Sequence, residues 1–390
     1  MALSGLVTTM PDSTNSVPHV CLFILKFGDG GVERMMVNIA RGLSLIGVKV
    51  DFIIKNSNAP YLHLLPERVR VIKFPVAKQS DSLPRLLDYL QQNDPDILLT
   101  AKTRDDEIAM QARQRQNGKT RFYLRPGTAL VSRMEARGMG RLRRWLKTRN
   151  LVKLFNQTDG VVAVSQGVAN EVMALSGIPA DRINVIKNPT ITPELYELSQ
   201  AELPDPWLAE DQPPVILGIG GLRRQKDFPT LLRAFAQLRR QQPCRLMILG
   251  QGNKEAQLKQ LAGELAIEED FRLVGFVDNP YVYLKHAGLF VLSSLWEGSP
   301  NVLTEALALG TPSVSTDCPS GPFEITRAGE VVPLVEVGDV DGLAKAMLQT
   351  LNEPLDPKKL QSAVSEYTLE RSARSYLAAF GLTAPVAADG

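Results

Sequence analysis

The sequence contains few residues of the kinds that build disulfide frameworks or metal sites. It has three cysteines and three histidines among 390 residues. The cysteines are far apart, and each lies beside an apolar run: Cys21, Cys244 and Cys318. We expect them to be buried thiols in a reducing compartment, not members of a disulfide framework. The histidines show no metal-ligand spacing, so no zinc site is expected.

The sequence also lacks the long apolar segment of a membrane-spanning protein. No uninterrupted apolar run approaches the ~20 residues that a spanning helix needs. The N-terminal segment has no basic stretch followed by a sustained apolar core, so it is not a convincing signal peptide. The net charge of +2 gives no general affinity for polyanions. We expect a cytoplasmic location, with peripheral contact at the inner face of the cell membrane as a further option.

The length of the chain and the order of its apolar segments predict two α/β domains. A chain of 390 residues is too long for one compact core. Strand and helix signals alternate along both halves, which favours doubly wound parallel sheets. We expect domains at 18–190 and 214–368, joined by a Pro-rich linker at 191–213. Residues 1–17 are predicted to be a flexible tail, and a C-terminal helix is predicted within 369–390.

The stretch from Leu292 to Thr316 is the one around which the second domain is organised. Its apolar start predicts the end of a short buried strand, and a loop follows. Pro300 fits the first position of a helix, where its missing N–H and fixed φ cost nothing. Gly310 then ends that helix. The stretch therefore predicts a strand, a loop and a helix that begins at the edge of a sheet.

A helix start of this kind suits an anionic ligand that carries hydroxyl groups. Ser299, Asn301 and Val302 are expected to offer free N–H groups at the positive end of the helix dipole. Two carboxylates flank the turn, Glu297 in the loop and Glu305 in the helix. Carboxylates accept hydrogen bonds from hydroxyl groups. The pattern indicates a sugar nucleotide, with its diphosphate at the helix start and its sugar and ribose beside the carboxylates.

Two further stretches place glycine or positive charge after a strand. Gly28–Glu33 follows a buried-strand signal and opens a helix, which is typical of a βαβ start. It lacks the third glycine of a dinucleotide fingerprint, so that interpretation is not favoured. In the second half, Gly220 to Lys226 places fixed positive charge at the carboxyl end of a strand, where ligands of open α/β sheets bind.

The spacing of Glu297 and Glu305 within EGSPNVLTEALALGTP resembles the signature of the retaining glycosyltransferases of sequence family 4. Those are GT-B enzymes that use nucleotide sugars. The continuation Ser315–Ile325 is similar to the branch that builds bacterial surface polysaccharides and lipid-linked oligosaccharides, and Val185–Pro189 looks like a family landmark. The resemblance implies two Rossmann-like α/β domains whose parallel sheets face each other across a cleft, with the C-terminal helix crossing back to the first domain.

The resemblance also implies the residues of a donor site. Glu297 would contact the donor sugar, and Glu305 the ribose. The turn at Gly30 and Gly31 would let the backbone approach the diphosphate; the alternative is a tight turn only. The residues expected to be catalytic are Glu297, Lys226 and Arg224. The residues expected to bind the donor are Gly30, Gly31, Gly220, Arg223, Gly250, Gly275, Ser299, Asn301, Val302 and Glu305.

The sequence departs from the family pattern at one phosphate-binding position. The family motif is G-R-L-x-x-x-K, whose Arg and Lys both hold the diphosphate. Lys226 matches the Lys, but Gly221 stands where the Arg is expected. Arg223 or Arg224 can supply the second charge, because a guanidinium suits phosphate contacts. The sequence does not decide between them.

The implied reaction is a retaining transfer of a sugar from a nucleotide sugar, with a UDP-sugar as the expected donor. The acceptor would be a saccharide or a polyprenyl-pyrophosphate-linked saccharide. No metal and no other cofactor is expected, because the family does not need a divalent ion. Leu124–Thr128 lacks the His that family members often carry near the reacting sugar, so we propose no protein general base. Acceptor choice is assigned to the Gly30 turn, the Arg125 region and a basic segment at 133–153.

That basic segment carries eight Lys or Arg residues against one acidic residue, Glu135. On a helix, its apolar residues share one arc: Met139, Leu142, Trp145 and Leu146. A basic amphipathic helix suits anionic lipid or a pyrophosphate-linked acceptor. A helix that packs this arc on the sheet and solvates its basic face fits equally well. Nucleic acid is not an expected partner, since no recognised binding motif accompanies the charge.

Two other functions remain open at this stage. One is a sugar-nucleotide epimerase or hydrolase of GT-B type, which would keep the fold and change the reaction. The other is a non-catalytic scaffold with a sugar-nucleotide fold, for which the Gly221 departure is the support. The carboxylate spacing between Glu297 and Glu305 argues against the first.

Overall fold

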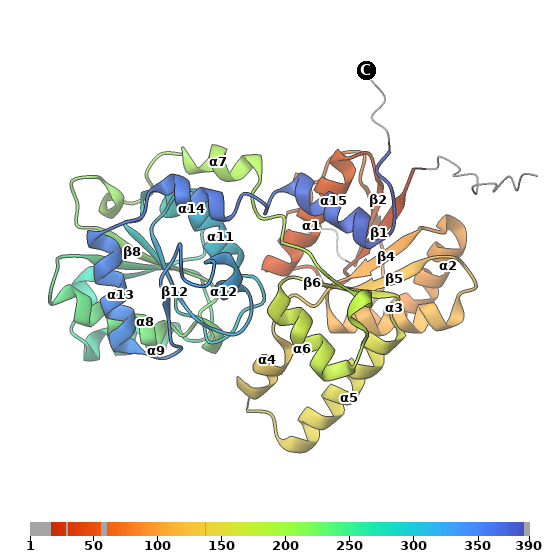
Figure 1. Cartoon of the computed structure of the whole chain (residues 1–390), viewed down its shortest axis with the longest axis horizontal. Helices are drawn as coiled ribbons and strands as arrows, with labels where there is room; N and C mark the ends of the chain where they lie inside the picture. Colours follow the sequence, from red (N-terminus) through yellow and green to blue (C-terminus); the bar gives the residue numbers. More distant parts are fainter. Residues whose placement is uncertain (1–16, 29, 56–60, 137, 386–390) are drawn as a thin grey trace, which may run out of the picture.

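The computed structural model describes residues 17–28, 30–55, 61–136 and 138–385. Of the predicted tail at 1–17, only Val17 lies within these residues. The chain forms two α/β domains that lie side by side, each built on a parallel sheet (Figure 1). The prediction of two Rossmann-like domains is confirmed.

The first sheet has seven parallel strands in the order β3-β2-β1-β4-β5-β6-β7. The strands are β1 (His19–Phe23), β2 (Lys49–Ile54), β3 (Arg70–Lys73), β4 (Ile97–Thr100), β5 (Arg121–Leu124), β6 (Gly160–Ala163) and β7 (Ile183–Val185). In the centre, Cys21 of β1 pairs with Asp51 of β2 and Leu98 of β4. Every residue of β1 is buried, as expected for a strand covered by helices on both faces.

Helices cover both faces of this sheet. They are α1 (Gly31–Leu45), α2 (Leu83–Asn93), α3 (Thr103–Arg115), α4 (Leu130–Ala136), α5 (Arg141–Gln157) and α6 (Gln166–Ser176), with short 3-10 turns η1 (Leu62–Leu64), η2 (Gln79–Ser82) and η3 (Ala180–Arg182). One apolar cluster packs α2, α3, α5 and α6 on one face. A second cluster packs α1 on the other face, together with α15 (Leu369–Ala379) from the end of the chain.

The second sheet has six parallel strands in the order β10-β9-β8-β11-β12-β13. They are β8 (Val215–Ile219), β9 (Arg245–Leu249), β10 (Phe271–Gly275), β11 (Leu289–Leu292), β12 (Ser313–Thr316) and β13 (Leu334–Val335). The helical elements are α7 (Pro193–Ser199), η4 (Pro206–Leu208), η5 (Arg224–Lys226), α8 (Phe228–Arg239), α9 (Glu255–Glu264), η6 (Glu268–Asp270), α10 (Tyr281–His286), α11 (Asn301–Ala308), α12 (Gly321–Ile325), α13 (Val340–Asn352) and α14 (Pro357–Ala363). Apolar clusters fill both sides of this sheet as well.

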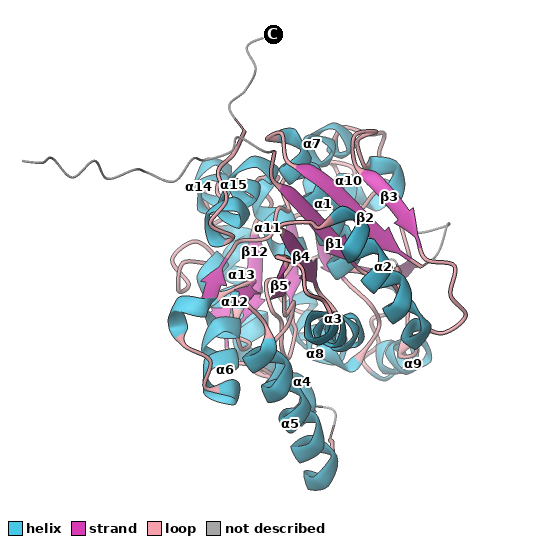
Figure 2. Ribbon diagram, turned by 90° about the vertical axis from the view of Figure 1, so that its right-hand side faces the viewer, coloured by secondary structure: helices cyan, strands magenta, loops and turns pink. Residues whose placement is uncertain are grey.

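The basic segment at 133–153 differs from the single helix on which its apolar arc was placed. It spans the end of α4 and most of α5, and Gly138 lies between them with φ +60°. Met139 therefore lies outside α5. The second half of α5 is anchored in the core through Leu151, Leu154 and Phe155, whereas its first half projects from the molecule (Figures 1 and 2). None of the helices in the described ranges, α5 included, is long and apolar enough to cross a bilayer.

The chain passes between the domains twice, and the two passages lie side by side. The Ile191 N–H donates to the Tyr367 carbonyl at 2.9 Å. Ile191 also forms an isolated parallel bridge with Thr368. Because the two connecting segments are hydrogen-bonded to each other, they form one paired connection between the domains instead of two independent linkers.

The last helix, α15, packs on α1 of the first domain (Figure 1). Tyr376 and Phe380 are buried there, and the Phe380 ring meets that of Tyr123 with centroids 4.7 Å apart. Contact between the two helices is close at Gly42 of α1. A Cβ at this position would lie 2.6 Å from the Leu369 carbonyl oxygen. The glycine therefore sets how closely α15 can approach.

We expect Gly42→Ala to destabilise the protein, although alanine favours a helix over glycine by about 1 kcal/mol. The added methyl group must displace a backbone carbonyl, and overpacking of this kind costs about 1–3 kcal/mol. A lowered midpoint of thermal unfolding measures the net loss.

Gly263→Ala in α9 is the matched control. Gly263 is an exposed helical glycine whose added Cβ would meet only the end of the Glu268 side chain, at 3.1 Å. This variant is expected to unfold at the wild-type temperature or above it. If Gly42→Ala unfolds at the same temperature as Gly263→Ala, the close packing of α15 on α1 does not contribute to stability as we describe.

Candidate active site

Three glycines form a row at the carboxyl ends of neighbouring strands β8, β9 and β10. Their φ angles are +151° at Gly220, +138° at Gly250 and +89° at Gly275, values that favour glycine. The Gly250 N–H donates to the Gly275 carbonyl at 2.7 Å. A Cβ on Gly250 would lie 2.0 Å from the Gly220 carbonyl oxygen. The row therefore presents bare backbone at the edge of the sheet where ligands of open α/β folds bind.

Lys226 and Glu297 meet beside this row. The Lys226 Nζ donates to Glu297 Oε1 at 2.7 Å, and Ser294 Oγ donates to the same oxygen at 2.7 Å. Gln225 Nε2 donates to Oε2 at 3.3 Å. The Lys226 stem crosses Gly220 so closely that a Cβ there would lie 2.5 Å from Cε. The buried Glu297 carboxylate is thus compensated by one cation and two neutral donors, which is what a buried charge requires.

The first turn of α11 presents unpaired hydrogen-bond donors. The helix begins at Asn301, one residue later than expected, with Pro300 in the N-cap position. The N–H groups of Ser299, Asn301 and Val302 have no acceptor among the residues that the structure describes. Unpaired amides and the positive end of the dipole together make this helix start suitable for an anion.

The Gly-rich turn of the first domain faces this helix start. A Cβ on Gly31 would lie 3.1 Å from Asn301 Nδ2, so the two domains approach closely at this point. Glu33 braces the turn, because its Oε1 accepts the Gly28 N–H at 3.1 Å. A Cβ on Gly30 would lie 2.8 Å from Glu33 Oε2. The structure therefore brings Gly31 of the first domain next to the Asn301 side chain at the start of α11 in the second domain.

Glu305 lies one turn further into α11 and is 2% exposed. Its Oε1 forms an ion pair with Arg34 of α1, which belongs to the first domain. Arg34 also donates from NH1 to the Tyr281 hydroxyl at 3.2 Å. Burial raises the pKa of the Glu305 carboxyl, and the charge and hydrogen bond of Arg34 oppose that rise.

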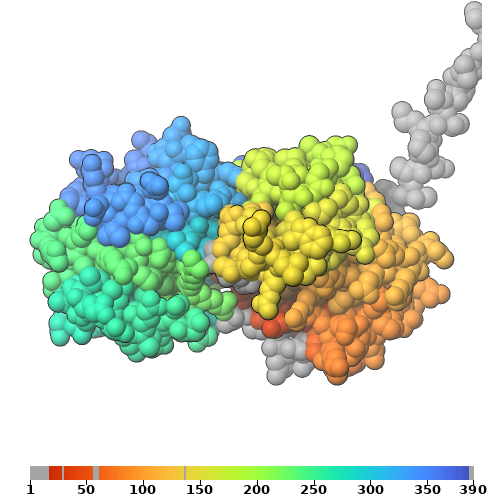
Figure 3. Space-filling model, turned by 90° about the horizontal axis from the view of Figure 1, so that it is seen from below, coloured from red at the N-terminus to blue at the C-terminus, as the bar shows by residue number. Residues whose placement is uncertain are grey.

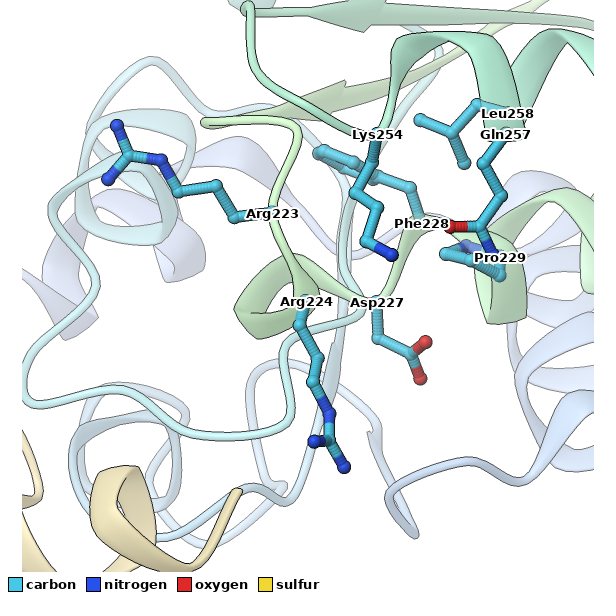
Figure 4. Close-up of a pocket in the computed structure, with 8 residues that line it drawn as sticks. All are labelled: Arg223, Arg224, Asp227, Phe228, Pro229, Lys254, Gln257 and Leu258. Carbon is cyan, nitrogen blue, oxygen red and sulfur yellow. The ribbon is translucent and has the colours of Figure 1, made fainter. Parts of the chain in front are cut away.

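Arg223 and Arg224 point in different directions (Figure 4). The Arg223 side chain passes so close to Gly221 that a Cβ there would lie 3.3 Å from Arg223 Nε. Arg224 lies near Asp227; burial raises the pKa of that carboxyl, and the charge of Arg224 is among the effects that lower it. Both arginines border a cavity of about 220 Å³ between η5, α8 and α9.

A buried polar chain links α15 to the start of α11. Arg125, 2% exposed, donates from Nε to the Tyr376 hydroxyl at 2.9 Å and from NH2 to Asn188. Asn188 Nδ2 in turn donates to Asn301 Oδ1 at 2.8 Å. We expected the Arg125 region to contribute to acceptor choice. The Arg125 side chain is instead buried, and it supports the start of α11 through Asn188.

Of the predicted side chains, Lys226 and Glu297 are in direct contact, whereas Arg224 lies on the Asp227 side of η5. Sequence analysis missed Arg34 and Asn188, which reach the site from the first domain and the connecting segment. Arg34 directly follows the Gly30-Gly31-x-Glu33 turn, and Asn188 lies within the Val185–Pro189 landmark. Both were therefore adjacent to a recognised signal, but no local pattern indicates which residue of the other domain they meet.

The remaining titratable groups suggest no second centre. Within the described part of the chain, no group of three or more His, Cys, Asp or Glu side chains is arranged to hold a metal ion. The three cysteines are buried and free, as the sequence predicts.

Sequence models of two glycosyltransferase families match the chain. The model described as "Glycosyl transferases group 1" matches residues 199–371. The model described as "Glycosyltransferase Family 4" matches residues 29–192. Both domains are therefore matched, and the second model begins just before the Gly30 turn.

Curated relatives match most of the chain. It is 29% identical over 357 residues to an N-acetylgalactosamine-N,N'-diacetylbacillosaminyl-diphospho-undecaprenol 4-alpha-N-acetylgalactosaminyltransferase of Campylobacter jejuni, covering 88% of this chain and 91% of the relative. It is 28% identical over 361 residues to the lipopolysaccharide core biosynthesis glycosyltransferase LpsE of Rhizobium meliloti, covering 90% and 95%.

Solved structures share the fold. HepE of Anabaena in complex with UDP superimposes with a TM-score of 0.74 at 16% identity, over 94% of this chain and 100% of HepE. The lipopolysaccharide outer core galactosyltransferase WaaB superimposes with a TM-score of 0.71 at 18% identity, over 94% and 99%. With both domains matched by family models and the two-domain arrangement matched by these structures, the chain belongs to the group 1, family 4-like glycosyltransferases of GT-B fold.

Proposed function

We propose that the protein transfers a sugar from a UDP-sugar, with retention, to a saccharide or polyprenyl-pyrophosphate-linked acceptor in the assembly of bacterial surface polysaccharide or glycolipid. One observation carries this proposal. The unpaired amides of Ser299, Asn301 and Val302 lie between two carboxylates, Glu297 on the loop side and Glu305 on the helix side. That order matches the sugar, diphosphate and ribose of a nucleotide sugar.

The nucleotide part of the donor is proposed to lie along α11 and the glycine row. The amides of the first turn would hold the diphosphate, and Glu305 would accept hydrogen bonds from the ribose. Gly275, where an added Cβ would meet no atom within 4 Å, leaves space for the nucleoside. HepE, which shares the fold, is solved with UDP, and this supports UDP as the nucleotide.

Glu297 and Lys226 are proposed to hold the transferring sugar and the leaving phosphate. The Lys226 Nζ lies 2.7 Å from Glu297 Oε1, and we propose that its charge also acts on the diphosphate. Charge placed where negative charge develops is the largest single contribution to many enzymatic rates. Glu297 would then accept hydrogen bonds from sugar hydroxyls. Because the amides and Lys226 together supply this stabilisation, we propose that no metal or other cofactor is needed.

Retention of configuration is proposed to follow from front-face displacement. The Leu124–Thr128 segment offers no His at the reacting sugar, and Arg125 within it is buried. The leaving phosphate would therefore accept the proton of the acceptor hydroxyl as the new glycosidic bond forms on the same face. The acceptor oxygen loses its proton to the phosphate that departs, so no separate base is needed.

The second phosphate-binding cation is proposed to be Arg223 and not Arg224. The family motif has its Arg at the position of Gly221, and the Arg223 side chain runs past that glycine. The Arg223 guanidinium has no hydrogen bond or ion pair within the described part of the chain, although the backbone of this residue is bonded to Gly221 and Lys226. Arg224 points away from Arg223 and lies near Asp227 (Figure 4). Arg223, two positions after Gly221 in the same loop, would thus supply the second positive charge.

The acceptor side is proposed to include contact with an anionic membrane through the first half of α5. Leu142, Trp145 and Leu146 are 70%, 55% and 53% exposed, so these three residues of the apolar arc do not pack on the sheet. Arg141 and Arg143 beside them are exposed as well. This segment lies on the face of Figure 3, next to the boundary between the domains. The Campylobacter jejuni relative is named for a diphospho-undecaprenol substrate, which supports a lipid-linked acceptor.

Family membership weighs against both alternative functions. The models that match the two domains are glycosyltransferase models, which disfavours an epimerase or hydrolase. A non-catalytic scaffold rested on the missing Arg at Gly221, and Arg223 offers a replacement for it.

Nucleotide sugars are expected to raise the thermal unfolding temperature. A ligand that binds only the folded state stabilises it by about 2.7 kcal/mol at a hundred times its dissociation constant. UDP and GDP, and their sugars, are to be compared with uridine and guanosine, which lack the diphosphate. If no nucleotide sugar shifts the transition, the donor site is wrong. If uridine shifts it as much as UDP, the amides of α11 do not bind the diphosphate.

Moving the arginine within its loop is expected to preserve binding. Arg223→Ser should weaken UDP binding about tenfold, since a hydrogen bond to a charged group contributes about 1.5–3 kcal/mol. The double variant Gly221→Arg, Arg223→Ser should recover most of that loss, because Gly221 has a negative φ that arginine tolerates. Isothermal titration calorimetry measures both. Arg224→Ser is the control; if it weakens UDP more than Arg223→Ser does, the assignment is reversed.

Vesicle binding tests the exposed half of α5. The wild type is expected to bind vesicles that contain phosphatidylglycerol more tightly than pure phosphatidylcholine, and added salt should weaken this binding. Replacing Leu142, Trp145 and Leu146 by Ser should reduce sedimentation with these vesicles at least about tenfold, because the apolar area that enters the bilayer is lost.

The matched control replaces three exposed apolar residues of the second domain by Ser: Tyr196, Leu198 and Leu203. This control should bind vesicles like the wild type, and both triple variants should keep UDP binding. Equal binding of all three proteins to both kinds of vesicle would contradict a role of α5 at the membrane.

A further inference from the structure

Glu305 is a buried carboxylate whose counter-charge comes from the other domain. It lies on α11 of the second domain and is 2% exposed. The cation that pairs with it, Arg34, lies on α1 of the first domain and is itself only partly exposed. A carboxylate this deeply buried is costly unless it is paired. The second domain alone therefore does not provide the ionised form of this group with a counter-charge.

The two helices meet in register at this point. Gly31 and Arg34 lie about one turn apart on α1, and they face Asn301 and Glu305, about one turn apart on α11. One helical turn rises about 5.4 Å. Arg34 is therefore held one turn away from the unpaired amides that we propose for the diphosphate. This is the position where the ribose of a bound nucleotide would lie.

The contact leaves one carboxylate oxygen available. Arg34 is bonded to Oε1 of Glu305, and Oε2 has no hydrogen bond within the described part of the chain. The other titratable groups near this pair are Tyr281 of α10, which accepts a hydrogen bond from Arg34, Tyr61, and Glu194 of α7. None of these is a cation that could replace Arg34. Tyr281 stays neutral at physiological pH, since burial raises its pKa to about 12.

We propose that Arg34 is a positioning residue of the donor site: it keeps Glu305 ionised and fixes its orientation, so that Oε2 accepts the hydrogen bonds of the donor ribose. This inference rests on the proposed function, in which Glu305 binds the ribose. It adds that nucleotide binding depends on the first domain, which supplies the charge that the ribose carboxylate needs. Binding of the nucleotide and contact between the domains are then coupled.

A second ion pair on the same helix separates this role from simple adhesion between the domains. Arg41, two turns after Arg34 on α1, pairs with Glu194 of α7 in the second domain. It joins the same two domains, but it lies away from the start of α11. If Arg34 only holds the domains together, loss of Arg41 should have a similar effect on the nucleotide.

The test measures the affinity of the full-length protein for UDP and GDP by calorimetry, in the wild type and in Arg34→Met, Arg34→Lys and Arg41→Met. Arg34→Met should bind at least about tenfold more weakly than the wild type at neutral pH, since an ionised carboxylate is a much stronger acceptor than a neutral one. Arg34→Lys should recover part of the affinity, because it restores the charge. Arg41→Met should bind like the wild type.

The pH dependence is the readout that a purely structural role would not change. Without Arg34, the carboxyl group of Glu305 stays protonated to higher pH, because burial raises its pKa and the opposing charge is gone. The ratio of the variant's dissociation constant to that of the wild type should therefore shrink as the pH rises and this carboxyl group ionises in the variant. A UDP analogue without ribose hydroxyl groups should show a much smaller difference between the two proteins.

The outcomes distinguish the inference from the proposed function. If neither UDP nor GDP binds the wild type, the donor site and this inference both fail. If the wild type binds the nucleotide but Arg34→Met binds it equally well or more tightly, Arg34 does not position Glu305. Its ion pair then only holds the two domains together when no nucleotide is bound. Equal losses in Arg34→Met and Arg41→Met, with no pH dependence, would also overturn the proposal.

Discussion

The buried charge of Glu305 is the constraint on which the rest of this site depends. A carboxylate on α11 can stay ionised at 2% exposure only if a cation reaches it, and that cation, Arg34, belongs to the other domain. The pair therefore fixes how α1 and α11 approach each other. Through α1 it also involves α15, which packs on that helix and carries the end of the chain back to the first domain.

The part of the site that we propose for the phosphates is built differently, because it is made of backbone. Gly220, Gly250 and Gly275 exclude side chains, and the start of α11 leaves its amides unpaired. Backbone donors keep their direction without losing rotamer freedom, so they are preorganised for an anion. The flexible Lys226 side chain is instead held by Glu297. The proposed site thus combines backbone donors with a lysine side chain that is held by a carboxylate.

Local signals explain which parts of this arrangement could be predicted from the sequence. Strands that are buried on both faces, such as β1, leave continuous apolar runs in the sequence. Pro300 marks the start of α11, and Gly310 marks its end. The strands β7 and β13 have only three and two residues, which is too few to show a period in the sequence. Arg34 and Asn188 were missed for a physical reason: their partners are 271 and 113 residues away. Such contacts depend on how the domains meet.

The buried Arg125 narrows where the acceptor can be recognised. Its guanidinium bonds to Tyr376 and Asn188, so it belongs to the support of α11 and is not free to choose an acceptor. In the proposed function, recognition would then fall to exposed groups of the first domain. The first half of α5 exposes Leu142, Trp145 and Leu146 to water, at a cost of about 25 cal/mol for each Å² of apolar area. A lipid-linked acceptor would explain this exposure, because both the membrane and the acceptor would then meet the enzyme on the same side.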